Sequence, residues 1–259
     1  MSNGIVSSIT RGGATEPFDL QVARNQILGH SSVSIFGYQA SVTTTAIPIW
    51  ENATVYTYIT SASTLTLVST STSDNTSAKI LISGLDSSFN IISETLALNG
   101  TSGVTTVNSY FRVNSLLMVS PGTSQNTNVG TITLKQSSNI VAQINVGIGK
   151  SQSTIYTVPA KYSFYLATSV VTSSNSSSGT GTFTYGVQAI NNVTGVNVNT
   201  LQQPFFAIYV ENRTADPFVY TEKTDIQWQL VTSTGTLAAG IIVTGKLIQN
   251  NNLVTGVGT

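Results

Sequence analysis

Short runs in which apolar residues alternate with Ser, Thr or Asn recur along the chain, and clusters of Gly, Asn, Asp, Pro and Ser separate them. Alternation with a period of two puts apolar side chains on one face of a β-strand, and the intervening clusters are typical of turns. The pattern predicts strands over residues 55–58, 64–69, 78–84, 91–98, 104–107, 110–120, 130–135, 140–146, 154–158, 163–172, 183–189, 205–210, 219–221, 226–232 and 238–247.

The spacing of these segments predicts how the chain is divided. Turns recur roughly every 8–12 residues, which is typical of β-sandwiches. A composition break at residues 147–153 separates two series of strands. We therefore expect an all-β protein with two tandem antiparallel β-sandwich, jelly-roll-like domains. The first spans residues 49–148 and the second residues 149–259, and an extended N-terminal arm over residues 1–48 precedes them.

Two local patterns make more specific predictions. The Asn99-Gly100 pair lies between two strand-like runs, and such a pair favours the tight turn of a β-hairpin. Pro48 has no backbone donor, so its segment is expected at the edge of a sheet.

The predicted arm has its own pattern. Its apolar residues fit either strand alternation or one helical face, and Gly29-His30 and Phe36-Gly37 indicate turns. We expect an extended segment with a short helical turn, suited to strand addition or to docking in a groove of a neighbouring subunit. The candidate subunit-contact residues are Phe18, Leu20, Val22, Arg24, Ile27, His30 and Phe36.

Composition narrows the classes of function. Only 8% of the 259 residues are charged and the formal net charge is zero, whereas roughly 25% is typical. Little electrostatic repulsion opposes self-association. No basic cluster indicates nucleic-acid binding, and no apolar run approaches the roughly 20 residues that span a bilayer. The N-terminus lacks the pattern of a secretory signal, so synthesis in a cytoplasm is expected.

The sequence offers few residues for catalysis or for metal binding. There is no cysteine, and His30 is the only histidine. Glu222 and Asp225 are separated by an odd number of positions in a strand-like stretch, which directs them to opposite faces, and ion pairs or hydrogen bonds at a sandwich rim are the favoured interpretation. Residues 147–151 end in Gly-Lys-Ser, but position 144 is Ile where a phosphate loop needs Gly. We expect no catalytic residue, no metal ligand and no cofactor.

Alternatives remain for three groups of residues. A carboxylate site around residues 216–225 is the least favoured, and would make the protein a hydrolase. Asp74, Asn75 and Asp86 are interpreted as turn residues before calcium ligands, because they lack the alternating acidic spacing of a calcium loop. The third group consists of aromatic residues, which we interpret as core or interface anchors before a carbohydrate-binding face. They are Tyr56, Tyr58, Tyr156, Tyr162, Phe164 and Tyr165.

Several motifs spread over most of the chain carry a family resemblance. They are residues 18–33 with Phe36-Gly37, residues 49–51, 84–86, 92–100, 104–107 and 111–113, and, after the composition break, residues 155–159 and 222–226. With these motifs the chain resembles a group of virion structural proteins of tailed bacteriophages, especially phages of marine bacteria and cyanobacteria. It departs from their pattern at Glu51-Asn52 and at Ala160.

The resemblance implies a non-enzymatic component of a phage particle, located in the virion and made in the host cytoplasm. We expect a head decoration (cement) or neck accessory protein that attaches through its N-terminal arm and forms a homo-oligomer, with a trimer as the favoured state. Its other partners would be the major capsid, portal, neck or tail proteins of the same particle, with neither nucleic acid nor membrane bound. The alternative is a tail or fibre module that binds host surface glycans through aromatic residues and the loop over residues 173–181.

Overall fold

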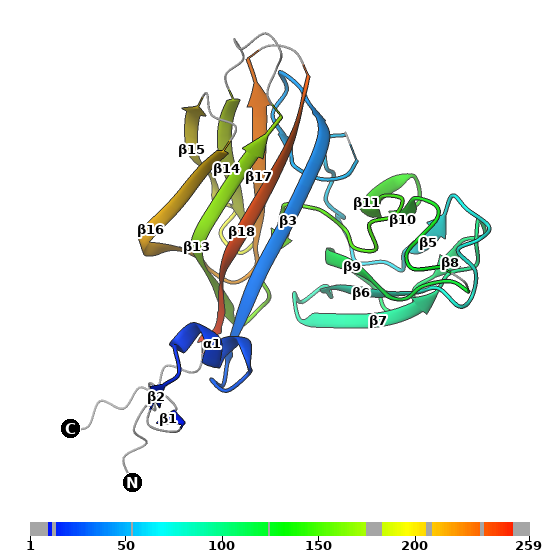
Figure 1. Ribbon diagram of the computed structural model, residues 1–259, viewed down its shortest axis with the longest axis horizontal. Coiled ribbons are helices and arrows are strands. Elements are labelled where there is room, and N and C mark those ends of the chain that lie inside the picture. The colour runs from blue at the N-terminus through cyan, green and yellow to red at the C-terminus, as the bar shows by residue number, and fades with distance from the viewer. Residues whose placement is uncertain are drawn as a thin grey trace.

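The computed structural model describes residues 10–11, 14–52, 54–123, 125–174, 183–205, 209–233 and 236–250. Figure 1 shows two packed β-structures side by side, with the helix α1 (Phe18–Ala23) at one end of the larger. A short hairpin of β1 (Thr10–Arg11) and β2 (Ala14–Thr15) precedes the helix. Within the described residues, no helix has the length and apolarity that crossing a bilayer requires.

The larger structure is a sandwich of two antiparallel sheets. One sheet has the order β16 (Tyr209–Tyr220), β13 (Tyr162–Ser173), β18 (Leu237–Gln249) and β3 (His30–Val42). The other has the order β12 (Ile155–Thr157), β17 (Thr224–Thr232), β14 (Phe183–Asn191) and β15 (Asn197–Phe205), and β4 (Ile47–Pro48) also pairs with β17. The chain alternates between the two sheets except at the β14–β15 pair, which is the topology of a jelly roll.

The strands β4 and β12 are two halves of one edge strand. Pro48 lies opposite Gln229 and Ile155 lies opposite Gln227 on the same neighbour, β17. The chain leaves this edge at Trp50 and returns at Ser153, and these two residues form an antiparallel bridge. The smaller sandwich is therefore an insertion into an edge strand of the jelly roll, and the edge position predicted for Pro48 is confirmed.

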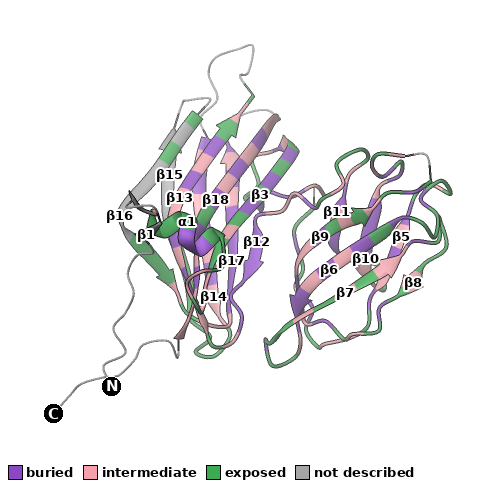
Figure 2. Ribbon diagram, turned by 60° about the horizontal axis from the view of Figure 1, so that its bottom comes forward, coloured by how far each residue is buried: buried purple, intermediate pink, exposed green. Residues whose placement is uncertain are grey.

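The inserted sandwich packs a four-stranded sheet against a three-stranded one. The first has the order β11 (Asn139–Ile144), β10 (Ile132–Gln136), β5 (Thr66–Ser69) and β8 (Val104–Thr105), and the second β7 (Ile91–Ala97), β6 (Lys79–Leu85) and β9 (Arg112–Ser120). Apolar positions alternate along the strands, so each sheet has one apolar face. The apolar faces of the two sheets of each sandwich form a separate core. Figure 2 shows this alternation as buried and exposed bands, and in β18 Ile241 and Val243 are fully buried while Thr244 is exposed.

The structure confirms an all-β, antiparallel, sandwich-type fold and corrects its division into domains. The arm over 1–48 and the separate domain over 149–259 are wrong, because residues 30–42 pair with β18 and place Ile35 and Val42 in the core of the larger sandwich. The strands β5 to β11 of the inserted sandwich lie within the other predicted domain, 49–148. The C-terminal strands need β3 and β4 to complete their sheets, so the larger sandwich is built from both ends of the chain.

Some local predictions also change. A turn does form at Asn99-Gly100, and Gly100 has a positive φ of 59°, but β7 pairs with β6 and β8 pairs with β5. The predicted hairpin is wrong, because this turn crosses from one sheet to the other. Residues 55–58 form no strand, and the predicted strand over 205–210 and the loop over 173–181 lie partly outside the described residues.

Candidate functional site

The N-terminal segment folds back onto one end of the jelly roll. The carbonyl oxygen of Pro17 accepts hydrogen bonds from the N–H groups of Leu20 and Gln21, at 3.0 and 3.1 Å, which starts the helix. Asn25 has a positive φ of 57° and ends the helical conformation. The Gly29 carbonyl oxygen accepts a hydrogen bond from the N–H of Gln249 at 2.8 Å. The segment that precedes β3 is therefore hydrogen-bonded to the end of the C-terminal strand, β18.

Side-chain contacts also attach the helix to the sheet. Val22 in α1 is 1% exposed. The Nζ of Lys246 lies 3.0 Å from the Asp19 carboxylate and donates to the Ser32 hydroxyl at 3.1 Å. Residues 16–29 are therefore part of the folded subunit.

The candidate subunit-contact residues divide into two groups. Phe18 and Leu20 are about half exposed, and the ring centroids of Phe18 and His30 lie 5.8 Å apart in a T-shaped arrangement. Val22 is buried, which excludes it from direct contact with another subunit and corrects that assignment. Leu28, which the sequence reasoning missed, is 88% exposed.

The polar candidates make local contacts. The Arg24 guanidinium forms an ion pair with Glu16. The Nδ1 atom of His30 is 3.0 Å from the Leu28 carbonyl oxygen, a turn hydrogen bond within the segment. Ile27 is partly buried. The structure thus brings Phe18 and His30 together and leaves Phe36 on a separate part of β3.

Phe36 belongs to what we call the outer sheet face, the exposed side of β16-β13-β18-β3. Phe36 lies opposite Ile242, and Ile242 lies opposite Val170. In the next row of this face, Tyr38 on β3 and Tyr209 on β16 stand at the two edges, and both rings are exposed. Exposed aromatic and aliphatic side chains that share one sheet face are typical of protein–protein contact sites.

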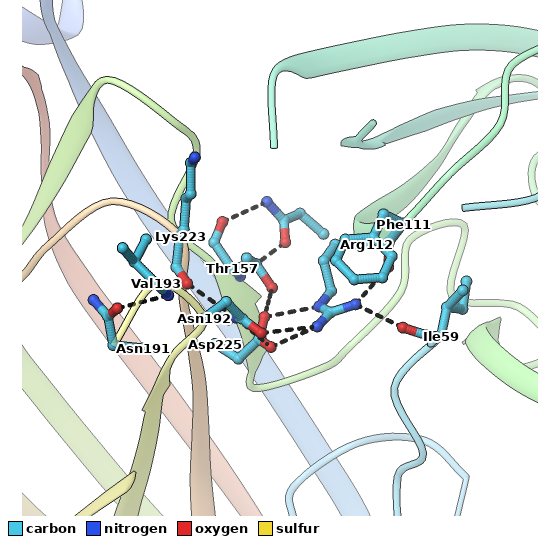
Figure 3. A network of polar contacts seen from close by, with 10 residues as sticks. Ile59, Phe111, Arg112, Thr157, Asn191, Asn192, Val193, Lys223 and Asp225 are labelled. Carbon is cyan, nitrogen blue, oxygen red and sulfur yellow. Dashed lines mark hydrogen bonds and ion pairs between the residues drawn. The ribbon is translucent and has the colours of Figure 1, made fainter. Parts of the chain in front are cut away.

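A second cluster of polar residues joins the two sandwiches (Figure 3). Arg112, at the start of β9, donates from Nε and Nη2 to the two carboxylate oxygens of Asp225 on β17, each at 2.8 Å. Both side chains are almost fully buried. The Thr157 hydroxyl and the Asn192 amide donate to the same carboxylate at 2.6 and 2.8 Å. The carboxylate is therefore fully satisfied, as a buried charge requires.

The surroundings of Arg112 complete this joint. Its Nη1 donates to the carbonyl oxygens of Ile59 and Phe111, at 2.9 and 2.8 Å. Its guanidinium carbon lies 4.0 Å from the ring centroid of Phe111 and 4.6 Å from that of Tyr58. The planar guanidinium is suited to bidentate pairing with a carboxylate and to contacts with aromatic rings. The joint formed by Arg112 and Asp225 therefore fixes the orientation of the two sandwiches.

Sequence reasoning anticipated a structural ion pair at Asp225 but not its partner. Glu222 instead accepts the backbone N–H of Lys161 at 2.6 Å. Arg112 lies 113 positions from Asp225 along the chain, so no local pattern relates the two. A lone arginine at the start of an apolar strand was the available signal, because such a charge needs a buried partner.

The other acidic candidates have structural contacts. Asp74 is buried and accepts the N–H groups of Val129 and Gly130, each at 2.9 Å. Asp86 accepts three hydrogen bonds from Ser88 and Asn90, and these lower the pKa of its carboxyl against the opposing effect of burial. In the described part of the chain, His, Asp and Glu side chains form no group of three that could hold a metal ion.

Glu51 lies at the point where the insertion begins. Burial raises the pKa of its carboxyl from 4.5 to about 7, although the N–H groups of Asn145 and Gln152 oppose this shift. The Asn145 N–H donates to the Glu51 carboxylate at 3.1 Å. This site therefore gains a proton near neutral pH.

Comparisons with known proteins add little. No protein-family model matches the chain, and no curated protein matches it. Among solved structures, the VP2 subviral particle of infectious bursal disease virus is similar at 12% identity and a TM-score of 0.28, over 86% of this chain and 73% of that one. A structure of the Gx strain of the same virus is similar at 11% identity and a TM-score of 0.27, over 86% of this chain and 72% of that one. TM-scores this low support no argument about fold or function.

Proposed function

We propose that the protein is a non-enzymatic structural component of a virus particle that assembles through its outer sheet face and the adjacent N-terminal segment. The observation that carries the proposal is the exposed pair of Phe36 and Tyr38 beside Ile242 and across the sheet from Tyr209. Burying such side chains between subunits contributes roughly 1.5–3 kcal/mol each. The low content of charged residues supports the same proposal, since little repulsion opposes association.

The finer assignment rests on the phage-like motifs in the sequence. According to this assignment, the protein is a head decoration or neck accessory protein of a tailed bacteriophage, forms trimers, and binds capsid, portal, neck or tail proteins. Jelly rolls also occur in lectins and cupins, so the fold by itself does not select this role. The contact surface makes the proposal testable.

Self-association is tested with substitutions on the outer sheet face. Phe36→Asp combined with Tyr38→Asp should reduce the wild-type oligomer to monomers, measured by sedimentation velocity, because charges would be buried at the contact. Val198→Asp places one such charge on an exposed position of β15 in the other sheet and should leave the oligomer intact. Deletion of residues 1–40 is unsuitable, because it removes most of β3 from the core sheet.

The particle role is tested separately. Particles purified from the lysate in which the protein is made should contain it in a fixed ratio to their other proteins, measured by quantitative mass spectrometry. The Phe36→Asp, Tyr38→Asp protein should be lost from them. A wild-type protein that is monomeric at every concentration and absent from particles would contradict the proposal.

A further inference from the structure

The face of the jelly roll that lies away from its core on β17, β14 and β15 carries a groove of about 520 Å³. This volume falls within the range of roughly 300–1,000 Å³ that is typical of small-molecule sites. Its floor comes from the sheet, and its wall comes from residues 55–58, which enter the inserted sandwich. The insertion therefore creates the groove by placing a wall on an otherwise open sheet face.

Four side-chain amides occupy the floor. Asn199, Gln188 and Gln227 lie in one row across three adjacent strands. Gln229, two positions further along β17, donates to the side-chain oxygens of Gln188 and Gln227, at 3.2 and 3.0 Å. Gly186 lies opposite Gln229 and adds no side chain to the floor. The amides thus hold one another in place at the bottom of the groove.

These amides retain unused hydrogen-bonding groups. Among the described residues, none bonds the Gln188 amide nitrogen, the Gln229 side-chain oxygen or the Asn199 amide. An amide offers a donor and an acceptor side by side, a match for neighbouring hydroxyl groups that each donate and accept. The free groups therefore suit a ligand with several hydroxyls.

The wall supplies apolar surface. Val55 is 67% exposed and Tyr58 is partly buried, whereas Tyr56, which supports Tyr58 with ring centroids 5.0 Å apart, is only 8% exposed. Burial, followed by the nearby Asp225 carboxylate, raises the pKa of the Tyr58 phenol well above its usual value, so it stays neutral. Among the lining residues that the structure describes, none is Asp, Glu, Lys or Arg. A neutral ligand is favoured, because a charged one would lose hydration without gaining a partner.

We propose that this groove binds a neutral saccharide, with its hydroxyls on the Gln188, Gln229 and Asn199 amides and an apolar C–H face against Val55 and Tyr58. A neutral sugar combines vicinal hydroxyls with an apolar face, as this lining requires. A peptide would also offer donors and acceptors, but they alternate along its backbone and do not lie side by side. The proposal is independent of the particle role, since the groove and the outer sheet face lie on different sheets.

A glycan array tests the proposal with the full-length protein as the labelled probe. We expect binding confined to glycans that lack sialic acid and sulfate. Isothermal titration with the best neutral glycan should then show at least a tenfold weaker Kd for Gln188→Ala and for Gln229→Ala. Gln136→Ala, which removes a similar surface amide from the inserted sandwich, should bind like the wild type.

A further variant guards against misfolding. Asn199 is exposed on β15, so Asn199→Lys should obstruct the groove rim while leaving the thermal unfolding midpoint unchanged. The folded wild type failing to bind any neutral glycan would overturn the proposal, as would binding of acidic glycans alone. Binding of peptides instead of glycans, or glycan binding that all three groove variants leave unchanged, would also overturn it. Phe36→Asp with Tyr38→Asp should keep glycan binding, which separates this outcome from failure of the assembly proposal.

Discussion

At the scale of single residues, buried polar groups set the sensitivity of this fold to its conditions. Glu51 lies where the edge strand of the jelly roll opens to admit the inserted sandwich, and burial raises its pKa to about 7. The folded state holds this proton more strongly than the unfolded state. Stability from this group is therefore complete below about pH 4.5 and is lost as the pH rises through about 7.

Glu51→Gln should remove this dependence. The substitution keeps an acceptor for the Asn145 N–H but carries no charge, so the free energy of unfolding should rise by about 1–3 kcal/mol at pH 8 and stay nearly unchanged at pH 4.5. Urea unfolding at the two pH values measures the difference. Glu94→Gln removes the same charge from a surface carboxylate and serves as the matched control. Equal gains at both pH values would contradict the assignment.

At the scale of elements, β3 shows why local sequence misled. The Phe36-Gly37 pair predicts a turn, but Gly37 lies in the middle of a strand of 13 residues. A Cβ there would collide with the Ile49 carbonyl oxygen and the Thr154 side chain. This glycine therefore permits close approach between β3 and the edge strand formed by β4 and β12. In the sequence, a glycine with this role cannot be distinguished from a glycine in a turn.

Gly37→Ala should consequently destabilise the larger sandwich. We expect a loss of about 1–3 kcal/mol in the free energy of unfolding, because neither backbone nor Thr154 can move without disturbing the core. Ser34→Ala, on the exposed face of the same strand, should change it little. Chemical unfolding of the two variants measures the effect, and similar midpoints would show that the close approach is not needed.

At the scale of the whole molecule, the buried Arg112–Asp225 pair links two sandwiches whose cores are separate. Asp225→Asn leaves the Arg112 charge buried without its counter-charge, and we expect a loss of about 3–5 kcal/mol. Arg112→Met with Asp225→Asn should recover part of this loss, since no buried charge remains. Glu222→Gln is the control on a neighbouring carboxylate.

The same variants should alter the arrangement of the two sandwiches. Small-angle X-ray scattering should show a wider range of shapes for Asp225→Asn than for the wild type, because the cores stay folded while their joint loosens. A rigid, wild-type scattering curve together with an unchanged unfolding free energy would mean that the joint does not fix the orientation.

The sequence by itself determined the all-β class, the antiparallel sandwiches, the edge position of Pro48 and a structural role for Asp225, although it placed that residue at a sandwich rim and not in a buried pair. These depend on local alternation, turn chemistry and the cost of burying charge, which a short window of residues contains. Of the candidate contact residues, Phe18, Leu20 and Phe36 are exposed as expected, whereas Val22 is not.

Only the tertiary structure decided that β3 and β4 belong with the C-terminal strands, that the smaller sandwich is an insertion, and that Arg112 meets Asp225. It also placed residues 55–58 over the amides of β14, β15 and β17. Each of these depends on pairing between residues about a hundred or more positions apart. Strand periodicity specifies which face of a strand is buried but not which distant strand lies beside it, so such pairings appear only when the whole chain packs.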